Sequence, residues 1–206
     1  MSAYVLFRLV STIFFDIGFV ALLRTDLRSL YKGQIWKFFI YFTNWGLLLL
    51  ITRINCQCFE ILGDPVRLPP WFLPKLISLS NVTSLVISVA FWLLVYEGQA
   101  KYQQRWFFNQ FEHSFTSAFC LVDTVVNPLR KSDLDWTLPV LIGISYLIFT
   151  IIFELLGLSN AEGDNFIYAI IQWKKNPKKT ALTWIVIFMA MILTHAFFMS
   201  LNAVIK

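Results

Sequence analysis

The stretch Trp106–Asn127, WFFNQFEHSFTSAFCLVDTVVN, is long enough for a helix to cross a bilayer, yet it carries many polar side chains. Because a polar group that faces hydrocarbon has no hydrogen-bond partner, we expect these side chains to turn toward the interior of a helix bundle. The pattern therefore predicts an all-α membrane protein built around a polar interior seam. On a helix, six of the polar side chains of this stretch form one stripe: Asn109, His113, Thr116, Cys120, Asp123 and Asn127.

The composition supports a membrane protein and excludes other classes. Of the 206 residues, 58% are hydrophobic and only 14% are charged, whereas a soluble domain has about 25% charged residues. The net charge of +5 comes from basic residues between apolar segments, as membrane topology requires, so we predict no nucleic-acid partner. Three cysteines cannot form a disulfide framework, and the common metal and nucleotide motifs are absent. We therefore predict no metal and no cofactor.

Six apolar segments have the length of a membrane-spanning helix, which predicts one integral membrane domain over residues 1–206, a six-transmembrane-helix bundle. The polar and basic stretch Ser159–Lys179, between the last two segments, predicts a short interfacial or re-entrant helix. We expect the bilayer of the endoplasmic reticulum or the plasma membrane to surround the bundle. The predicted helices cover about residues 4–23, 35–52, 76–96, 106–127, 138–156 and 183–205.

Three of the polar residues in these segments are predicted to share one depth. At 1.5 Å per residue, Asp16, Thr43 and His113 each lie about 12 Å from the same membrane face. A threonine hydroxyl becomes a nucleophile when a base removes its proton, and histidine titrates in the right range to do so. Asn44, Asn109 or a backbone amide would then stabilise the oxyanion of an attacked ester. The shared depth of these residues therefore predicts a site in which a threonine attacks an ester.

Each of these residues also has a structural interpretation. A threonine in a membrane helix commonly bonds the carbonyl four residues earlier or packs at a helix interface. Asp16 would serve as a structural partner of Arg8, His113 or a hydroxyl group. His195, in the last apolar segment, is expected to form an interhelical hydrogen bond rather than to belong to the site.

The segment WKFFIYFTNWGLLL, residues 36–49, resembles the rolling stone branch of the androgen-induced protein family of multi-pass membrane proteins. It has the tryptophan–lysine start of the second span, the aromatic motif that ends at Thr43, and the Asn-Trp-Gly that follows. The spacing of ten residues from His113 to Asp123 is similar to that of the family. Further on, residues 127–149 and 166–173 resemble its polar loop, fifth span and tyrosine-containing turn.

The resemblance implies an activity and its residues. Characterised family members are threonine hydrolases of fatty acid esters of hydroxy fatty acids, which would make Thr43 the nucleophile and His113 the base. This chain departs from the family pattern before His113, where Asn-Gln-Phe-Glu replaces the usual His-Gly pair. Rolling stone proteins themselves are associated with cell fusion in muscle development.

Three functions stay open at this level. We predict an intramembrane hydrolase of a lipid ester. The first alternative is a non-catalytic membrane protein, either a cell fusion factor or an accessory subunit that binds protein partners. The second is a small transporter or lipid-binding bundle, with Asp16, His113 and His195 forming a proton or ligand path.

Overall fold

The structure is a computed structural model that describes residues 3–63, 68–96, 105–127 and 135–205. The described chain is all-α, as predicted. It contains short 3₁₀ (Ile35–Ile40) and π segments (Phe91–Val95 and Phe111–Phe115) besides its α-helices. The α-helices are α1 (Ala3–Ser29), α2 (Phe42–Leu62), α3 (Phe72–Ala90), α5 (Trp106–Gln110), α6 (Thr116–Val126), α7 (Thr137–Leu155) and α8 (Pro177–Ile205).

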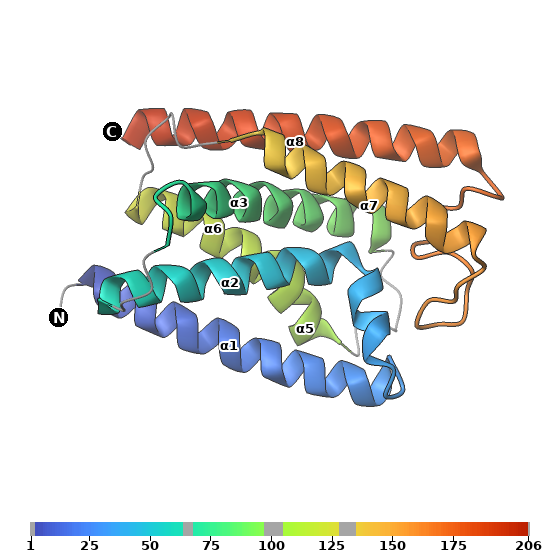
Figure 1. The fold of residues 1–206 in the computed structure, drawn as a ribbon, viewed down its shortest axis with the longest axis horizontal. Helices are drawn as coiled ribbons and strands as arrows, with labels where there is room; N and C mark the ends of the chain where they lie inside the picture. Colours follow the sequence, from blue (N-terminus) through green and yellow to red (C-terminus); the bar gives the residue numbers. More distant parts are fainter. Residues whose placement is uncertain (1–2, 64–67, 97–104, 128–134, 206) are drawn as a thin grey trace.

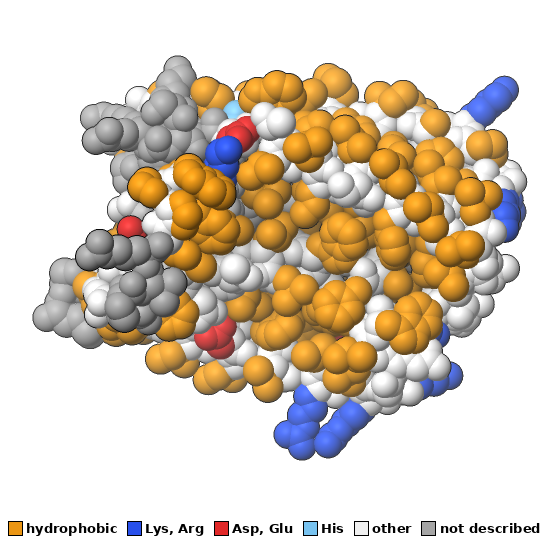
Figure 2. Space-filling view, in the orientation of Figure 1, with side chains coloured by type: hydrophobic (Ala, Val, Ile, Leu, Met, Phe, Trp, Pro, Cys, Tyr) orange, Lys and Arg blue, Asp and Glu red, His pale blue; other side chains and the backbone are white. Residues whose placement is uncertain are grey.

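Five helices are long and apolar enough to cross a membrane: α1, α2, α3 with its π extension to Val95, α7 and α8. They run roughly side by side, and both ends of the described chain lie at the same end of the bundle (Figure 1). Hydrophobic side chains cover the middle of the face in Figure 2. These features indicate an integral membrane protein. The remaining predicted span, residues 106–127, is helical from Trp106 to Val126 as α5, a π segment and α6 in succession.

The boundaries of the second predicted helix were wrong at both ends. The chain forms a 3₁₀ helix to Ile40 and then adopts an extended conformation at Tyr41, so α2 begins at Phe42 rather than at residue 35. At the other end the prediction stopped before the charged Arg53, but α2 continues to Leu62. The Arg53 side chain is fully buried in the bundle, because it has polar partners there.

The predicted helix at Ser159–Lys179 is also wrong. The segment between α7 and α8 consists of turns with an isolated bridge between Tyr168 and Ile171. It is nevertheless ordered by side chains that accept its backbone N–H groups. The Glu154 carboxylate accepts the N–H groups of residues 173 and 174 at 2.6 and 2.8 Å. Asn160 Oδ1 accepts those of residues 162 and 164, both at 2.9 Å.

The polar stripe faces the bundle interior, as predicted. All of its members except Asn127 are buried. At the end of the bundle near the chain termini, Asp123 of α6 forms ion pairs with Arg8 of α1 and Arg53 of α2. Arg53 also donates to Ser80 of α3. This ion network therefore joins α1, α2, α3 and α6, and the opposite end of the seam opens into a cavity.

Candidate functional site

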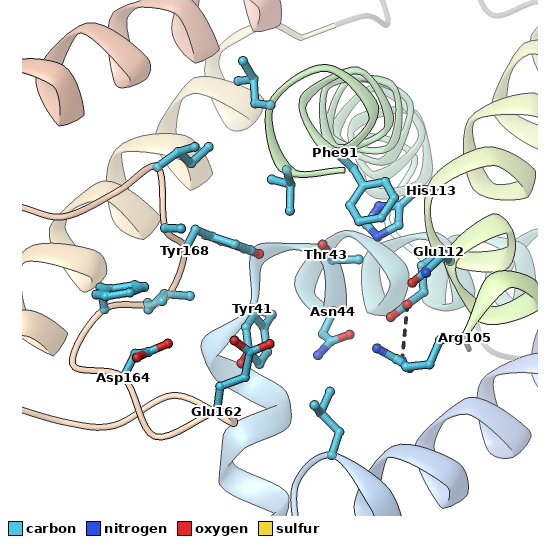
Figure 3. A pocket seen from close by; sticks show the side chains of 18 of the residues that line it. Tyr41, Thr43, Asn44, Phe91, Arg105, Glu112, His113, Glu162, Asp164 and Tyr168 are labelled. Carbon is cyan, nitrogen blue, oxygen red and sulfur yellow. Dashed lines mark ion pairs between the residues drawn. The ribbon is translucent and has the colours of Figure 1, made fainter. Parts of the chain in front are cut away.

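A cavity of about 300 Å³ lies at the end of the bundle opposite the termini, where the 3₁₀ segment, the start of α2 and the 157–176 segment meet. Four of the five predicted site residues line it: Thr43, Asn44, Asn109 and His113 (Figure 3). They come from α2 and from the 106–126 helical run, which are far apart in sequence. The volume is at the lower end of the range of small-molecule sites.

Thr43 is the second residue of α2, so it lies in the first turn of the helix and not deep within it as predicted. The Tyr168 hydroxyl accepts the N–H of Phe42, the residue before Thr43, at 3.1 Å, and Thr43 and Tyr168 line the same cavity. The first N–H groups of a helix have no partner within it and carry a partial positive charge. Tyr168 therefore caps the start of α2, and Thr43 lies at the positive end of this helix.

His113 lies in a π segment, a rare element that often marks functional sites. Its ring stacks on Phe91, with centroids 3.5 Å apart and planes tilted by 3°. Phe91 itself begins the other π segment, and Ser88 Oγ donates to the backbone carbonyl of His113. The side chain is buried, and its Nδ1 has no hydrogen-bond partner among the described residues. The imidazole is thus positioned by stacking while this nitrogen stays unpaired.

Asn44 does not have the free donors that the oxyanion role requires. Its Nδ2 donates to the Tyr31 hydroxyl at 3.1 Å and to the Phe38 carbonyl at 2.7 Å. An amide nitrogen has two hydrogens, so both are used. Asn44 instead connects the loop after α1 to the start of α2. Asn109, which is buried and lines the cavity, keeps its position in the site.

Asp16 is separated from the other predicted site residues. It does not line the cavity, and its carboxylate accepts a hydrogen bond from Asn55 at 2.9 Å. Arg8, its expected partner, pairs with Asp123. The depth expected for Asp16 and Thr43 was wrong because α1 continues to Ser29, past its predicted end at residue 23, and α2 begins at Phe42, seven residues after its predicted start.

Sequence reasoning missed the tyrosines and the charged residues of this cavity. Tyr31, Tyr41 and Tyr168 all line it, and burial raises the pKa of each hydroxyl above its usual value. They are therefore neutral hydrogen-bonding groups at physiological pH. Arg105 and Glu112 also line the cavity, and Arg105 Nη2 lies 3.7 Å from Glu112 Oε2. Tyr31 and Tyr41 lie close to helix ends, which could have drawn attention to them, whereas Tyr168 lies in the turns of the 157–176 segment and gave no such signal.

A second, smaller cavity of about 60 Å³ adjoins the first. Thr43 and Tyr168 line both cavities, together with Phe91. The rest of the second lining is mostly apolar and comes from α2, α3 with its π extension, α7, α8 and the 157–176 segment. Thr43 therefore lies between a polar cavity and an apolar one.

Comparison with known proteins gives the family. Residues 66–206 match the family described as protein rolling stone. The chain belongs to the rolling stone family. Protein rolling stone of Drosophila melanogaster is 23% identical over 175 residues, which cover 74% of this chain and 62% of that protein. This rolling stone family member thus spans less than two thirds of that relative, and no solved structure matches it.

The family match covers some residues of the candidate site but not Thr43. His113 lies within the matched residues 66–206, as do Phe91 and Tyr168, whereas Thr43 lies before them. The resemblance predicted from the sequence is confirmed at the level of the rolling stone family. Membership of the family does not by itself assign a catalytic activity, which is argued below from the geometry of the cavity.

Proposed function

We propose that this protein hydrolyses a lipid carboxylic ester, using Thr43 as the nucleophile and His113 as the general base. The observation that carries the proposal is that both side chains line one cavity, at the junction with an apolar cavity. An ester whose acyl chain entered the apolar cavity would present its carbonyl at Thr43. We further propose that the 106–126 helical run is a sixth span, which makes the site part of a six-helix bundle in the membrane.

The reaction would proceed in two steps. His113 removes the proton of Thr43 Oγ1 as the oxygen attacks the ester carbonyl carbon, and the imidazolium returns that proton to the leaving alcohol. The acyl group is then attached to Thr43. In the second step His113 deprotonates a water molecule that attacks the acyl carbon, which releases the fatty acid and restores the threonine.

Burial and hydrogen bonding support these roles. A buried imidazole nitrogen without a partner is costly, and such groups in native proteins commonly serve a ligand or a reaction. The positive end of α2 would favour a developing negative charge beside Thr43. Because the Asn44 donors are used elsewhere, we assign the oxyanion to the neutral Tyr168 hydroxyl, since Tyr168 lines both cavities together with Thr43.

The test is labelling of the purified protein with a fluorophosphonate probe, which reacts with activated hydroxyl nucleophiles. We expect wild type to be labelled and Thr43→Ala and His113→Ala to lose labelling. Two matched controls lie outside both cavities: Thr12→Ala on α1 and His195→Ala on α8. The imidazole Nδ1 of His195 also has no hydrogen-bond partner among the described residues. Both control variants should label as wild type does. An unlabelled wild type that is well folded in detergent would refute the proposal.

A second variant tests the oxyanion assignment. Tyr168→Phe keeps the ring but removes the hydroxyl, and loss of one such donor lowers kcat by about 10²–10³-fold in other enzymes. We expect a fall of this size in the hydrolysis of a short acyl ester, with the protein still folded. A kcat within about twofold of wild type would exclude Tyr168 from this role.

A further inference from the structure

The junction between the 157–176 segment and α8 is strongly basic. Residues 172–179, which we call the basic turn, read QWKKNPKK and contain Lys174, Lys175, Lys178 and Lys179. All of these lysine side chains are exposed, and none of them has an ion-pair partner among the described residues. In Figure 2, Lys and Arg side chains project from the right-hand end of the molecule, which is the end where α8 begins. The basic turn therefore presents a patch of unpaired positive charge at that end of the bundle.

Hydrogen bonds from buried side chains hold the backbone of the basic turn in place. The Glu154 carboxylate of α7 accepts the backbone N–H groups of Trp173 and Lys174 at 2.6 and 2.8 Å. The hydroxyl of Thr180, which is fully buried, accepts the N–H of Gln172 at 2.9 Å. The turn is thus closed at its start and just after its end. A partner that binds the lysines does not have to order this backbone first, and such ordering would oppose binding.

The lipid-facing surface of α8 gives the depth of the basic turn in the membrane. The large apolar side chains that α8 exposes run from Leu182 to Val204, which at 1.5 Å per residue is about 33 Å of helix. This length matches the hydrocarbon core of a bilayer, about 30 Å thick, and the headgroups add about 5–8 Å on each side. Lys178 and Lys179 precede Leu182 by about 5 Å along the helix axis. The basic turn therefore lies at the depth of the headgroups.

We propose that the basic turn binds the headgroups of anionic phospholipids in the leaflet at this end of the bundle. Clusters of about four to eight Lys or Arg next to a membrane helix bind such lipids, because each ammonium group is attracted to the phosphates and carboxylates of the leaflet surface. A lipid fits this surface better than an acidic protein does, since the lysines lie at headgroup depth. The proposal does not rest on ester hydrolysis, because none of the four lysines lines either cavity.

The experiment measures binding of two fluorescent lipids to the purified protein in neutral detergent: phosphatidylserine, which is anionic, and phosphatidylcholine with the same acyl chains. Wild type should bind phosphatidylserine at least about tenfold more tightly, because each lysine near an anionic surface contributes about fivefold in affinity. Removing the four charges should abolish most of this preference and leave binding of phosphatidylcholine unchanged. The variant is Lys174→Gln/Lys175→Gln/Lys178→Gln/Lys179→Gln.

The matched control is Arg24→Gln/Arg28→Gln/Lys32→Gln, which removes exposed basic side chains at the end of α1 and just after it, at the same end of the bundle (Figure 1). It should keep the preference of wild type for phosphatidylserine. An equal loss in the control and in the lysine variant would overturn the proposal, because the charge would then act without a local site. Equal binding of both lipids to wild type would overturn it too. A second measurement needs no variant: higher ionic strength should weaken the binding of phosphatidylserine to wild type, and a preference that salt leaves unchanged would also overturn the proposal.

Discussion

Replacing Asp123 with asparagine should be among the most destabilising single changes at the charged end of the bundle. The Asp123 carboxylate forms ion pairs with both Arg8 and Arg53, and all three side chains are buried. Asparagine has nearly the same shape but no charge. The variant therefore leaves two guanidinium groups in the interior without the carboxylate that joins them.

The size of the effect follows from what each arginine retains. Removing one partner of a buried ion pair costs about 3–5 kcal/mol, because the other charge remains buried and unpaired. Arg53 keeps its hydrogen bonds to Ser80 and Asn81, and Arg8 keeps one to Gln57. These bonds reduce the loss, so we expect the free energy of unfolding to fall by about 3 kcal/mol, the lower end of that range.

The assay is reversible unfolding in mixed micelles with a rising fraction of denaturing detergent. The matched control is Asp135→Asn, because Asp135 lies 3.6 Å from Lys75 with both side chains partly exposed. An exposed pair of this kind contributes about 0–1 kcal/mol. If Asp123→Asn destabilised the protein no more than this control, the ion network would not hold the four helices together, and the reasoning would be refuted.

Three further perturbations test the packing and the loops. Gly46→Leu should lower the free energy of unfolding by about 1–3 kcal/mol in the same assay, because even a Cβ at this position meets the Ile87 side chain. Gly46→Ala should be tolerated, because only the flexible end of the Ile87 side chain has to move. Glu154→Gln should speed amide hydrogen exchange at Trp173, and unchanged exchange would count against this anchor. Burial raises the pKa of the Tyr31 hydroxyl in the folded state above its value of about 10 in the unfolded state, so the free energy of unfolding falls as the pH rises past about 10. Tyr31→Phe has no such hydroxyl, so its free energy of unfolding should fall less than that of wild type between pH 8 and pH 11.

Much of the fold could be predicted because membrane helices follow simple rules. Length and apolarity located the helices, and the requirement that polar groups find partners placed the stripe of Trp106–Asn127 inside the bundle. The same rules misplaced both ends of α2. A charged Arg53 was taken to end the helix, whereas its partners on α3 and α6 are distant in sequence. Its burial could not have been predicted without knowing how the helices pack.

The site was predicted in part, for a similar reason. Thr43 and His113 were found because their side-chain chemistry is unusual in a membrane helix, and the structure brings both to one cavity. Asp16 was included on estimated depth alone, and errors in the end of α1 and in the start of α2 made that depth wrong. Tyr168 was missed as a contact of Thr43, because turns of the 157–176 segment, and no regular element, bring it there.

The two ends of the polar seam differ in how their polar groups are paired. At the Asp123 end, charged groups of α1, α2 and α6 pair with one another and Arg53 bonds the neutral Ser80 of α3, so their principal role is to fix the arrangement of the bundle. At the His113 end, the same seam opens into a cavity, and the imidazole Nδ1 has no hydrogen-bond partner in the part of the chain that the structure describes. Two π segments, Phe91–Val95 and Phe111–Phe115, meet there and hold the ring by stacking. An unpaired buried group that is held rigidly beside a cavity is the arrangement that a ligand or substrate would complete.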